Sequence, residues 1–248
     1  MFSLFIRGRF AVFRPFTTGS FRSTAPFMTP SAAYGLALNL AGVEMREDDG
    51  KSAMSLIRRS LPKLDVALGA PGDGAQWKWG GAGGGDHAVF PRVHEMYQQL
   101  HNYPVGKQGR EHATYTKGAK YNITPVRRSI LSGLAAVACF RRDESRAIEQ
   151  QVRAGLGGDA APRYGLPFLG DNSLLPDRIE VLESPPPCHW FVPIVADEGH
   201  LPRQGVGRLT VTIDRADSSR TRSRLFGPTA EATAVIPDSA WVEVDYTG

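Results

Sequence analysis

Residues 27–42 read FMTPSAAYGLALNLAG, and this stretch predicts the first helix of the fold. Strands are predicted before and after it in the sequence. Thr29 suits the N-cap position because its hydroxyl can accept a hydrogen bond from a free amide of the first turn. Pro30 suits the first helical position, where no amide hydrogen is needed. Apolar residues then recur at helical spacing, and Gly42 suits the left-handed conformation that ends many helices. We therefore expect one helix of about three and a half turns.

The segments around this helix indicate the fold class. Residues 3–13 are rich in β-forming side chains, and residues 63–70, 127–142 and 177–184 have the character of further strands. A second helix, capped by its first residue and ended by a glycine, is expected over residues 143–158. The order β-α-β-β-α-β is that of the ferredoxin-like motif, which also builds RNA-recognition (RRM) domains. The sequence thus predicts an α+β protein with a ferredoxin-like, RRM-like βαββαβ domain.

Two further regions complete the predicted organisation. We expect residues 1–184 to form the ferredoxin-like domain, with the glycine-rich residues 71–86 as a flexible loop and residues 86–126 as a thumb-like hairpin insertion. The prolines of SPPPC (184–188) stiffen the chain and indicate a boundary. Residues 185–248 are expected to form a smaller β-rich part, with short strands at 189–195, 207–214 and 240–246.

Composition limits the class of protein. The chain has 248 residues, of which 42% are hydrophobic, so it can bury a substantial core as a soluble globular protein. Arg7 and Arg9 interrupt the apolar N-terminus, which has no small-residue cleavage site, so we expect a strand there and no signal peptide. Cys139 and Cys188 are far apart in sequence and match no zinc or disulfide framework. We expect a cytoplasmic protein with no metal or other cofactor and no membrane segment.

Charge is distributed unevenly along the chain. The net charge is only +4, but the first 43 residues contain four arginines and no acid. Residues 103–128 contain one acid and six basic residues, which are Lys107, Arg110, Lys117, Lys120, Arg127 and Arg128. Two basic regions favour an anionic polymer as partner. A solvated charged surface is the commoner origin of such residues and remains the alternative.

The predicted insertion interleaves flat rings with these cations. Its rings are those of Tyr97, His101, Tyr103, His112, Tyr115 and Tyr121. This combination suits single-stranded RNA, because bases stack on rings at about 1–3 kcal/mol each while cations follow the phosphates. The alternative is a β-hairpin whose tyrosines pack across its strands.

No standard enzyme motif is present in the sequence. The histidines at 87, 94, 101 and 112 could act as general acids or bases, but their spacing matches no metal signature. The stretch GAGGG (81–85) lacks the lysine and hydroxyl of a phosphate-binding Walker loop. Ordinary surface or hydrogen-bonded roles are therefore the favoured interpretation of the histidines.

Four stretches, in this order, resemble the CRISPR-associated Cas-five family, above all its type I-B and developmental (Dev-S-like) branch. They are GRFAVFRPFTTGSFRSTAPFMTPSAAYGLALNLAG (8–42), YQQLHNYPVG (97–106), KYNITPVRRSIL (120–131), and RYGLPFLGDNSLLPDRIE (163–180) followed by HWFVPI (189–194). The resemblance implies a subunit of the Cascade surveillance complex. In that family a ferredoxin-like domain with a thumb-like hairpin grips the 5′ handle of the CRISPR RNA and contacts the large subunit and the first backbone (Cas-seven) subunit.

The resemblance also implies where RNA would be contacted. The handle phosphates would lie near Arg7, Arg14, Arg22 and the helix start at Thr29 and Ser31. The thumb would present Lys107, Arg110, Lys117, Lys120 and Tyr121. The loop 163–172, with Gly170 and Asn172 at its end, would match the family's glycine-containing turn near the RNA. Arg127 and Arg128 could contact RNA or could instead hold carboxylates of their own chain.

The resemblance speaks against nuclease activity. The type I-C branch cuts the precursor RNA with a tyrosine at the end of the first helix and a Lys-His pair before the third strand. With the sequences aligned on Gly35, the tyrosine position falls on Ala41, and Lys120-Tyr121-Asn122 keeps the lysine without the histidine. Each missing acid or base costs about 10²–10⁴ in rate. We expect an RNA-binding subunit without catalysis; the alternatives are a metal-independent processing endoribonuclease using Tyr34, His101 or His112, and an RNA-independent interaction subunit.

Overall fold

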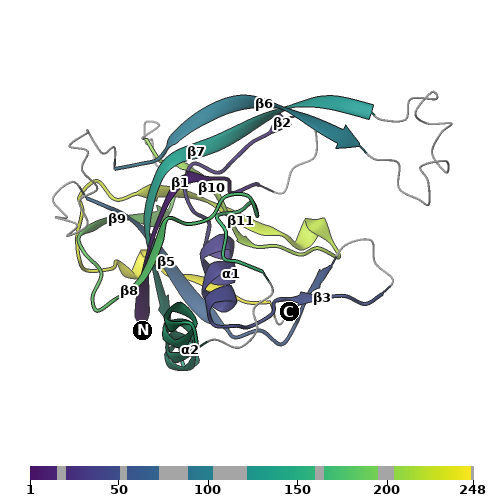
Figure 1. Cartoon of the computed structure of the whole chain (residues 1–248). Coiled ribbons are helices and arrows are strands. Elements are labelled where there is room, and N and C mark those ends of the chain that lie inside the picture. Colours follow the sequence, from purple (N-terminus) through teal and green to yellow (C-terminus); the bar gives the residue numbers. More distant parts are fainter. Residues whose placement is uncertain are drawn as a thin grey trace.

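The computed structural model describes residues 1–15, 21–50, 55–72, 89–102, 122–159, 165–194 and 204–246 (Figure 1). In chain order, the helices and strands are β1 (Phe2–Ala11), β2 (Phe21–Arg22), α1 (Pro30–Leu40), β3 (Arg46–Glu47), β4 (Leu56–Ile57), β5 (Leu64–Pro71), β6 (Arg92–Asn102), β7 (Asn122–Arg141), α2 (Ser145–Gly157), β8 (Arg178–Leu182), β9 (Cys188–Pro193), β10 (Gly207–Thr212), β11 (Arg222–Pro228) and β12 (Val242–Val244). Short 3-10 turns lie at Ser218–Arg220 and Asp238–Ala240.

A large, mainly antiparallel sheet organises the molecule. Its strands follow the order β10-β11-β9-β5-β7-β1-β8, with β12 paired to β5 and both β2 and β6 paired to β7. The central pair is β1 and β7, in which Phe2 lies opposite Phe140 and Ala11 lies opposite Leu131. Helix α1 follows β1 and helix α2 follows β7, and both helices contribute to the same hydrophobic core. The result is a sheet with two helices, in line with the predicted α+β class.

Helix α1 begins and ends where its sequence predicts. Thr29 has an extended backbone and its Oγ1 accepts a hydrogen bond from the amide of Ala32 at 3.2 Å, while Pro30 opens the first turn. Gly42 has a φ of 74°, the left-handed conformation that only glycine adopts without cost. The helix is buried on most of its surface, because α2 and β10 both pack against it.

Helix α2 starts later than its sequence predicts. Asp143 was expected to cap it, but the helix begins at Ser145, and Glu144 occupies the cap position without a side-chain cap bond. The carboxylate of Glu144 instead accepts a hydrogen bond from the backbone amide of Lys63 at 2.8 Å. This acid is therefore used to join α2 to the entrance of β5. Gly158 ends the helix in the left-handed conformation, as predicted.

The sheet is covered on both faces. Leu134, Ala136, Ala138 and Phe140 point to the helix side, which confirms their predicted alternation. The residues between them, including Val137 and Cys139, are also buried, in a second cluster with Trp190 and Ala240. Burial raises the pKa of the free Cys139 thiol to about 12. The strands are therefore apolar on both sides because C-terminal segments cover the face opposite the helices.

The C-terminal strands extend the same sheet. The predicted boundary at 184–188 falls between β8 and β9, and β9 and β12 both pair with β5. Phe191, Leu209 and Phe226 belong to the same core as the two helices. Strand β11 was not anticipated from the sequence, because its arginines at 222 and 224 mask the alternation expected of a strand.

Strands β6 and β7 form a long arm. The first half of β7 pairs with β6 from Arg92 opposite Ser132 to Asn102 opposite Asn122, and we call this pair the arm. Figure 1 shows it running above the body and projecting beyond it. Gly133, with a φ of 73°, lies where β7 leaves the body. The arm overlaps the predicted insertion (86–126) at residues 92–102 and 122–126. Residues 103–121 of that insertion lie outside the described ranges, as do residues 73–86 of the predicted glycine-rich loop.

Across the described segments, neither helix combines the length and the apolar character that crossing a membrane requires.

Replacing Thr29 by alanine removes the cap bond to Ala32 and is expected to lower the free energy of unfolding by about 1 kcal/mol. Thr29→Ser keeps the acceptor oxygen and should lie close to the native protein. Urea unfolding of the three proteins checks this, and equal stabilities for the alanine and serine variants would contradict the capping role.

Candidate nucleic-acid interface

The loop between α2 and β8 is pressed against the end of β1. The amide of Val12 donates to the carbonyl of Leu169 at 3.0 Å, and the Leu169 side chain is fully buried. Gly170 has a φ of 80°, and a Cβ there would lie 1.6 Å from the carbonyl oxygen of Val12. Only glycine allows this close approach of the two backbones. The approach places the next residue, Asp171, at the base of the arm.

Asp171 binds two arginines from distant parts of the chain. Its Oδ2 accepts from Arg14 Nη2 at 2.9 Å and from Arg128 Nη2 at 2.5 Å. Its Oδ1 accepts from the backbone amide of Ser173 at 3.1 Å and from the Ser173 hydroxyl at 2.7 Å. Burial alone would raise the pKa of Asp171, but the hydrogen bonds from Ser173 and the charge of Arg128 outweigh burial and lower that pKa to about 2. The carboxylate is thus anionic and fixed on both oxygens.

A third arginine joins this group. Arg22 on β2 lies in register with Arg128 on β7. Burial lowers the pKa of Arg14, and the positive charges of Arg128 and Arg22 lower it further, against the opposing effect of Asp171. We call Arg14, Arg22 and Arg128 the arginine cluster. Two guanidinium groups on one carboxylate, with a third arginine nearby, leave an excess of positive charge at the base of the arm.

On the face of β7 opposite Arg128, the arm and β2 expose aromatic rings together with a cation. Arg127 forms an ion pair with Glu95 and lies over the ring of Phe21, 5.5 Å from its centroid. Tyr97, directly opposite Arg127 on β6, is 80% exposed. Exposed rings next to guanidinium groups are suited to stacked bases. Phe21 was not singled out from the sequence, because only the pairing of β2 with β7 places it here.

The structure brings together some of the predicted site residues. Arg14, Arg22 and Arg128 meet, and Gly170 and the exposed Asn172 flank Asp171. Arg7 is exposed on β1, in register with Arg178 on β8, and lies outside the cluster. Arg127 and Arg128 do hold carboxylates of their own chain, as the alternative interpretation stated.

Thr29 and Ser31 are placed in the interior. They are 3% and 8% exposed, and their hydroxyl oxygens lie 3.1 Å apart. The Ser31 hydroxyl also donates to the carbonyl of Thr210 on β10 at 3.1 Å. Because β10 covers the start of α1, these hydroxyls serve the fold rather than an open phosphate site.

The five predicted thumb residues lie outside the described ranges; they are Lys107, Arg110, Lys117, Lys120 and Tyr121.

The described residues that were considered for catalysis lie in the core or on the arm. Tyr34 is fully buried, and its hydroxyl donates to the carbonyl of Pro62 at 2.7 Å; burial raises the pKa of this phenol. Ala41 is buried at the C-cap of α1. His94 Nε2 lies 2.7 Å from the Ser132 hydroxyl on an exposed part of the arm. His112 and the side chain of His101 are outside the described part of the chain.

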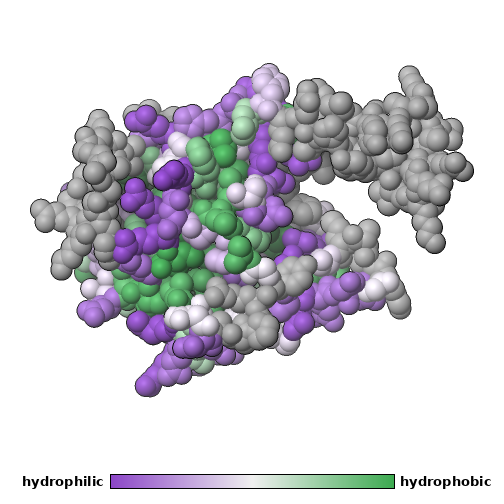
Figure 2. Space-filling view, viewed as in Figure 1, coloured by the Kyte–Doolittle hydropathy of each residue, from purple (hydrophilic) through white to green (hydrophobic). Residues whose placement is uncertain are grey.

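Apolar side chains are also exposed near the cluster. The loop that carries Asp171 exposes Leu166, Phe168 and Leu175. Figure 2 shows that apolar residues gather on one face of the body among hydrophilic ones. Exposed apolar surface of this kind marks contact sites for other molecules.

Comparison with known proteins gives a likeness in fold. No protein-family model matches the chain, and no curated protein matches it. Among solved structures, it is similar to a chain of one titled "CRISPR RNA-guided surveillance complex", with a TM-score of 0.51 and 14% sequence identity. The match covers 94% of this chain and 90% of that chain. The two chains therefore share a fold over nearly their whole lengths.

Two glycines of the loop that carries Asp171 allow the close packing of this loop against Val12 to be tested. Both Gly165 and Gly170 have positive φ, but a Cβ at Gly165 would meet nothing within 4 Å. Gly165→Ala should cost about 1–2 kcal/mol of unfolding free energy for the left-handed backbone alone. Gly170→Ala should cost clearly more, because the loop must also move away from Val12. Urea unfolding measures both, and equal losses would contradict the tight seating of the loop.

Proposed function

We propose that this chain is a non-catalytic subunit of a type I CRISPR Cascade complex, of the Cas-five family, that binds and caps the 5′ handle of the CRISPR RNA. The observation that carries the proposal is the arginine cluster around Asp171 at the base of an arm with exposed rings. The similarity in fold to a chain of a CRISPR RNA-guided surveillance complex supports it.

The arrangement of the sheet supports the ferredoxin-like assignment. Strands β8-β1-β7-β5 are neighbours in this order, α1 connects β1 towards β5, and α2 connects β7 to β8. This order and these connections support a βαββαβ unit. The arm lies between β5 and the second half of β7 in the chain, where the thumb of the family is expected.

The geometry of the cluster gives it a way to hold RNA. Asp171 uses one oxygen to fix Arg14 and Arg128, and each guanidinium has five N–H donors. The remaining donors of Arg14, which is the more exposed of the two, are then available to phosphates on a side chain that is already ordered, and this reduces the entropy lost on binding. Tyr97 and Phe21, beside Arg127 on the other face of β7, would stack bases there.

The surroundings of the candidate catalytic positions support a binding role without cleavage. Tyr34 directs its hydroxyl to a core carbonyl, and Ala41 offers no ionisable group. The proposed partners, besides the RNA handle, are the large subunit and the backbone (Cas-seven) subunits; the exposed apolar residues Leu166, Phe168 and Leu175 suit such protein contacts. No cofactor is required by this role.

RNA binding should depend on the exposed arginines of the cluster. Fluorescence anisotropy with a single-stranded RNA carrying the 5′ handle is expected to show at least about a tenfold loss of affinity for Arg14→Ala/Arg22→Ala. The slope of log affinity against log salt should also fall by about 1 to 1.5, because two phosphate contacts are removed.

The control is Arg146→Ala/Arg153→Ala, which removes the same charge from helix α2. It should bind like the native protein. Equal affinities for the two double variants, or binding that does not weaken with salt, would refute the proposed site. A discrete cut in repeat RNA without metal would refute the non-catalytic role separately.

A further inference from the structure

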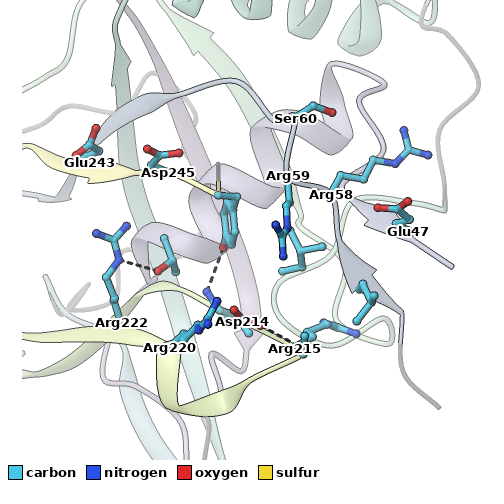
Figure 3. A pocket seen from close by; sticks show the side chains of 16 residues that line it. Glu47, Arg58, Arg59, Ser60, Asp214, Arg215, Arg220, Arg222, Glu243 and Asp245 are labelled. Carbon is cyan, nitrogen blue, oxygen red and sulfur yellow. Dashed lines mark hydrogen bonds between the residues drawn. The ribbon is translucent and has the colours of Figure 1, made fainter. Parts of the chain in front are cut away.

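A second basic site lies beside the turn that joins β10 to β11. A cavity of about 850 Å³ opens between residues 56–60, the turn joining β10 to β11, and residues 243–246 after the start of β12 (Figure 3). Its volume is in the range of pockets that hold organic ligands. It contains none of the arginine cluster, Asp171 or the arm residues.

Arginines from two separate segments line this cavity. There are five: Arg58, Arg59, Arg215, Arg220 and Arg222. Arg222 Nε donates to the Thr212 hydroxyl at 3.0 Å, and Arg220 pairs with Asp217 at 3.4 Å. Within the described segments, no hydrogen bond or ion pair joins Arg59 or Arg215 to another residue. Figure 3 shows Arg59 extending into the cavity toward the turn that carries Asp214 and Arg215.

The four acids of the described lining do not fully balance its five arginines. Asp245 pairs with Lys63 at 2.9 Å, and Glu243 pairs with Arg142 at 2.8 Å, so both acids have cationic partners outside the cavity. Asp214 Oδ1 accepts the backbone amides of Ala216 and Asp217, each at 2.8 Å. Glu47, the fourth acid, lies beside Arg58 in Figure 3. Across the described lining residues, five arginines against four acids leave a small net positive charge.

The floor of the cavity is anchored to the core. The Tyr246 hydroxyl accepts a hydrogen bond from the amide of Ile213 at 3.4 Å. Its ring packs against that of Tyr34, with centroids 5.6 Å apart. This ring therefore packs against the core. The other described lining residues have no aromatic ring on which a base could stack.

We propose that this cavity binds an acidic peptide segment of a partner protein. Guanidinium forks match carboxylates in two-bond geometry, and Arg59 and Arg215 supply them. A nucleic acid would gain little here, because the described lining offers no free ring on which a base could stack. A polypeptide can place carboxylates on the arginines and apolar side chains on Leu56 and Ile57. The proposal does not depend on the RNA-binding role.

Binding of labelled peptides to the full chain tests this proposal. The probe is a fluorescein-labelled peptide of alternating glutamate and leucine, compared with its glutamine counterpart and with a single-stranded RNA of equal charge. The acidic peptide should bind the native protein, and Arg59→Ala/Arg215→Ala should weaken it at least about tenfold. The glutamine peptide should not bind, and the RNA should be unaffected by this variant.

Matched variants keep the result interpretable. Arg146→Ala/Arg153→Ala loses the same charge and should bind the peptide normally, as should Arg14→Ala/Arg22→Ala. If the alanine variant melts early, Arg59→Lys/Arg215→Lys keeps the charge without the fork and should still weaken binding. No peptide binding, equal binding by the Arg59/Arg215 and Arg146/Arg153 variants, or RNA binding that requires Arg59 and Arg215 would overturn the proposal.

Discussion

The carboxylate of Asp171, held between Arg14 and Arg128, is the interaction on which the proposed interface depends. It adds a side-chain contact between three segments: the residues after β1, the first half of β7 and the loop before β8. Gly170 permits the close approach, and Ser173 fixes the second oxygen. Because the pair is partly buried, the carboxylate offsets the cost of placing arginines together and leaves them ordered at the base of the arm.

Local features of the fold could be predicted from the sequence, and contacts between distant segments could not. Thr29 and Gly42 act through hydrogen bonds and backbone angles within a few residues. The local sequence is therefore enough to predict where α1 begins and ends. Arg14, Arg128 and Asp171 are separated by more than a hundred residues in two of their three pairings, so the sequence indicated basic regions without their geometry. The packing of β10 over α1, which buries Ser31, could not be predicted from the sequence for the same reason, because the two elements are far apart in the chain.

The molecule has two arginine-rich sites with different chemistry. At the arm, arginines stand beside exposed rings, a combination suited to bases and phosphates. In the cavity near β10 and β11, arginines stand beside acids and apolar side chains, with the nearby ring packed into the core.

The measurement that tests the account most directly is photo-crosslinking of the chain to handle RNA containing 4-thiouridine, with the attached peptides identified by mass spectrometry. The account predicts crosslinks in the arm and β2, at Tyr97 and Phe21 above all, which disappear in Arg14→Ala/Arg22→Ala. Crosslinks confined to the segments around Arg59 and Arg215, or unchanged by that variant, would contradict it.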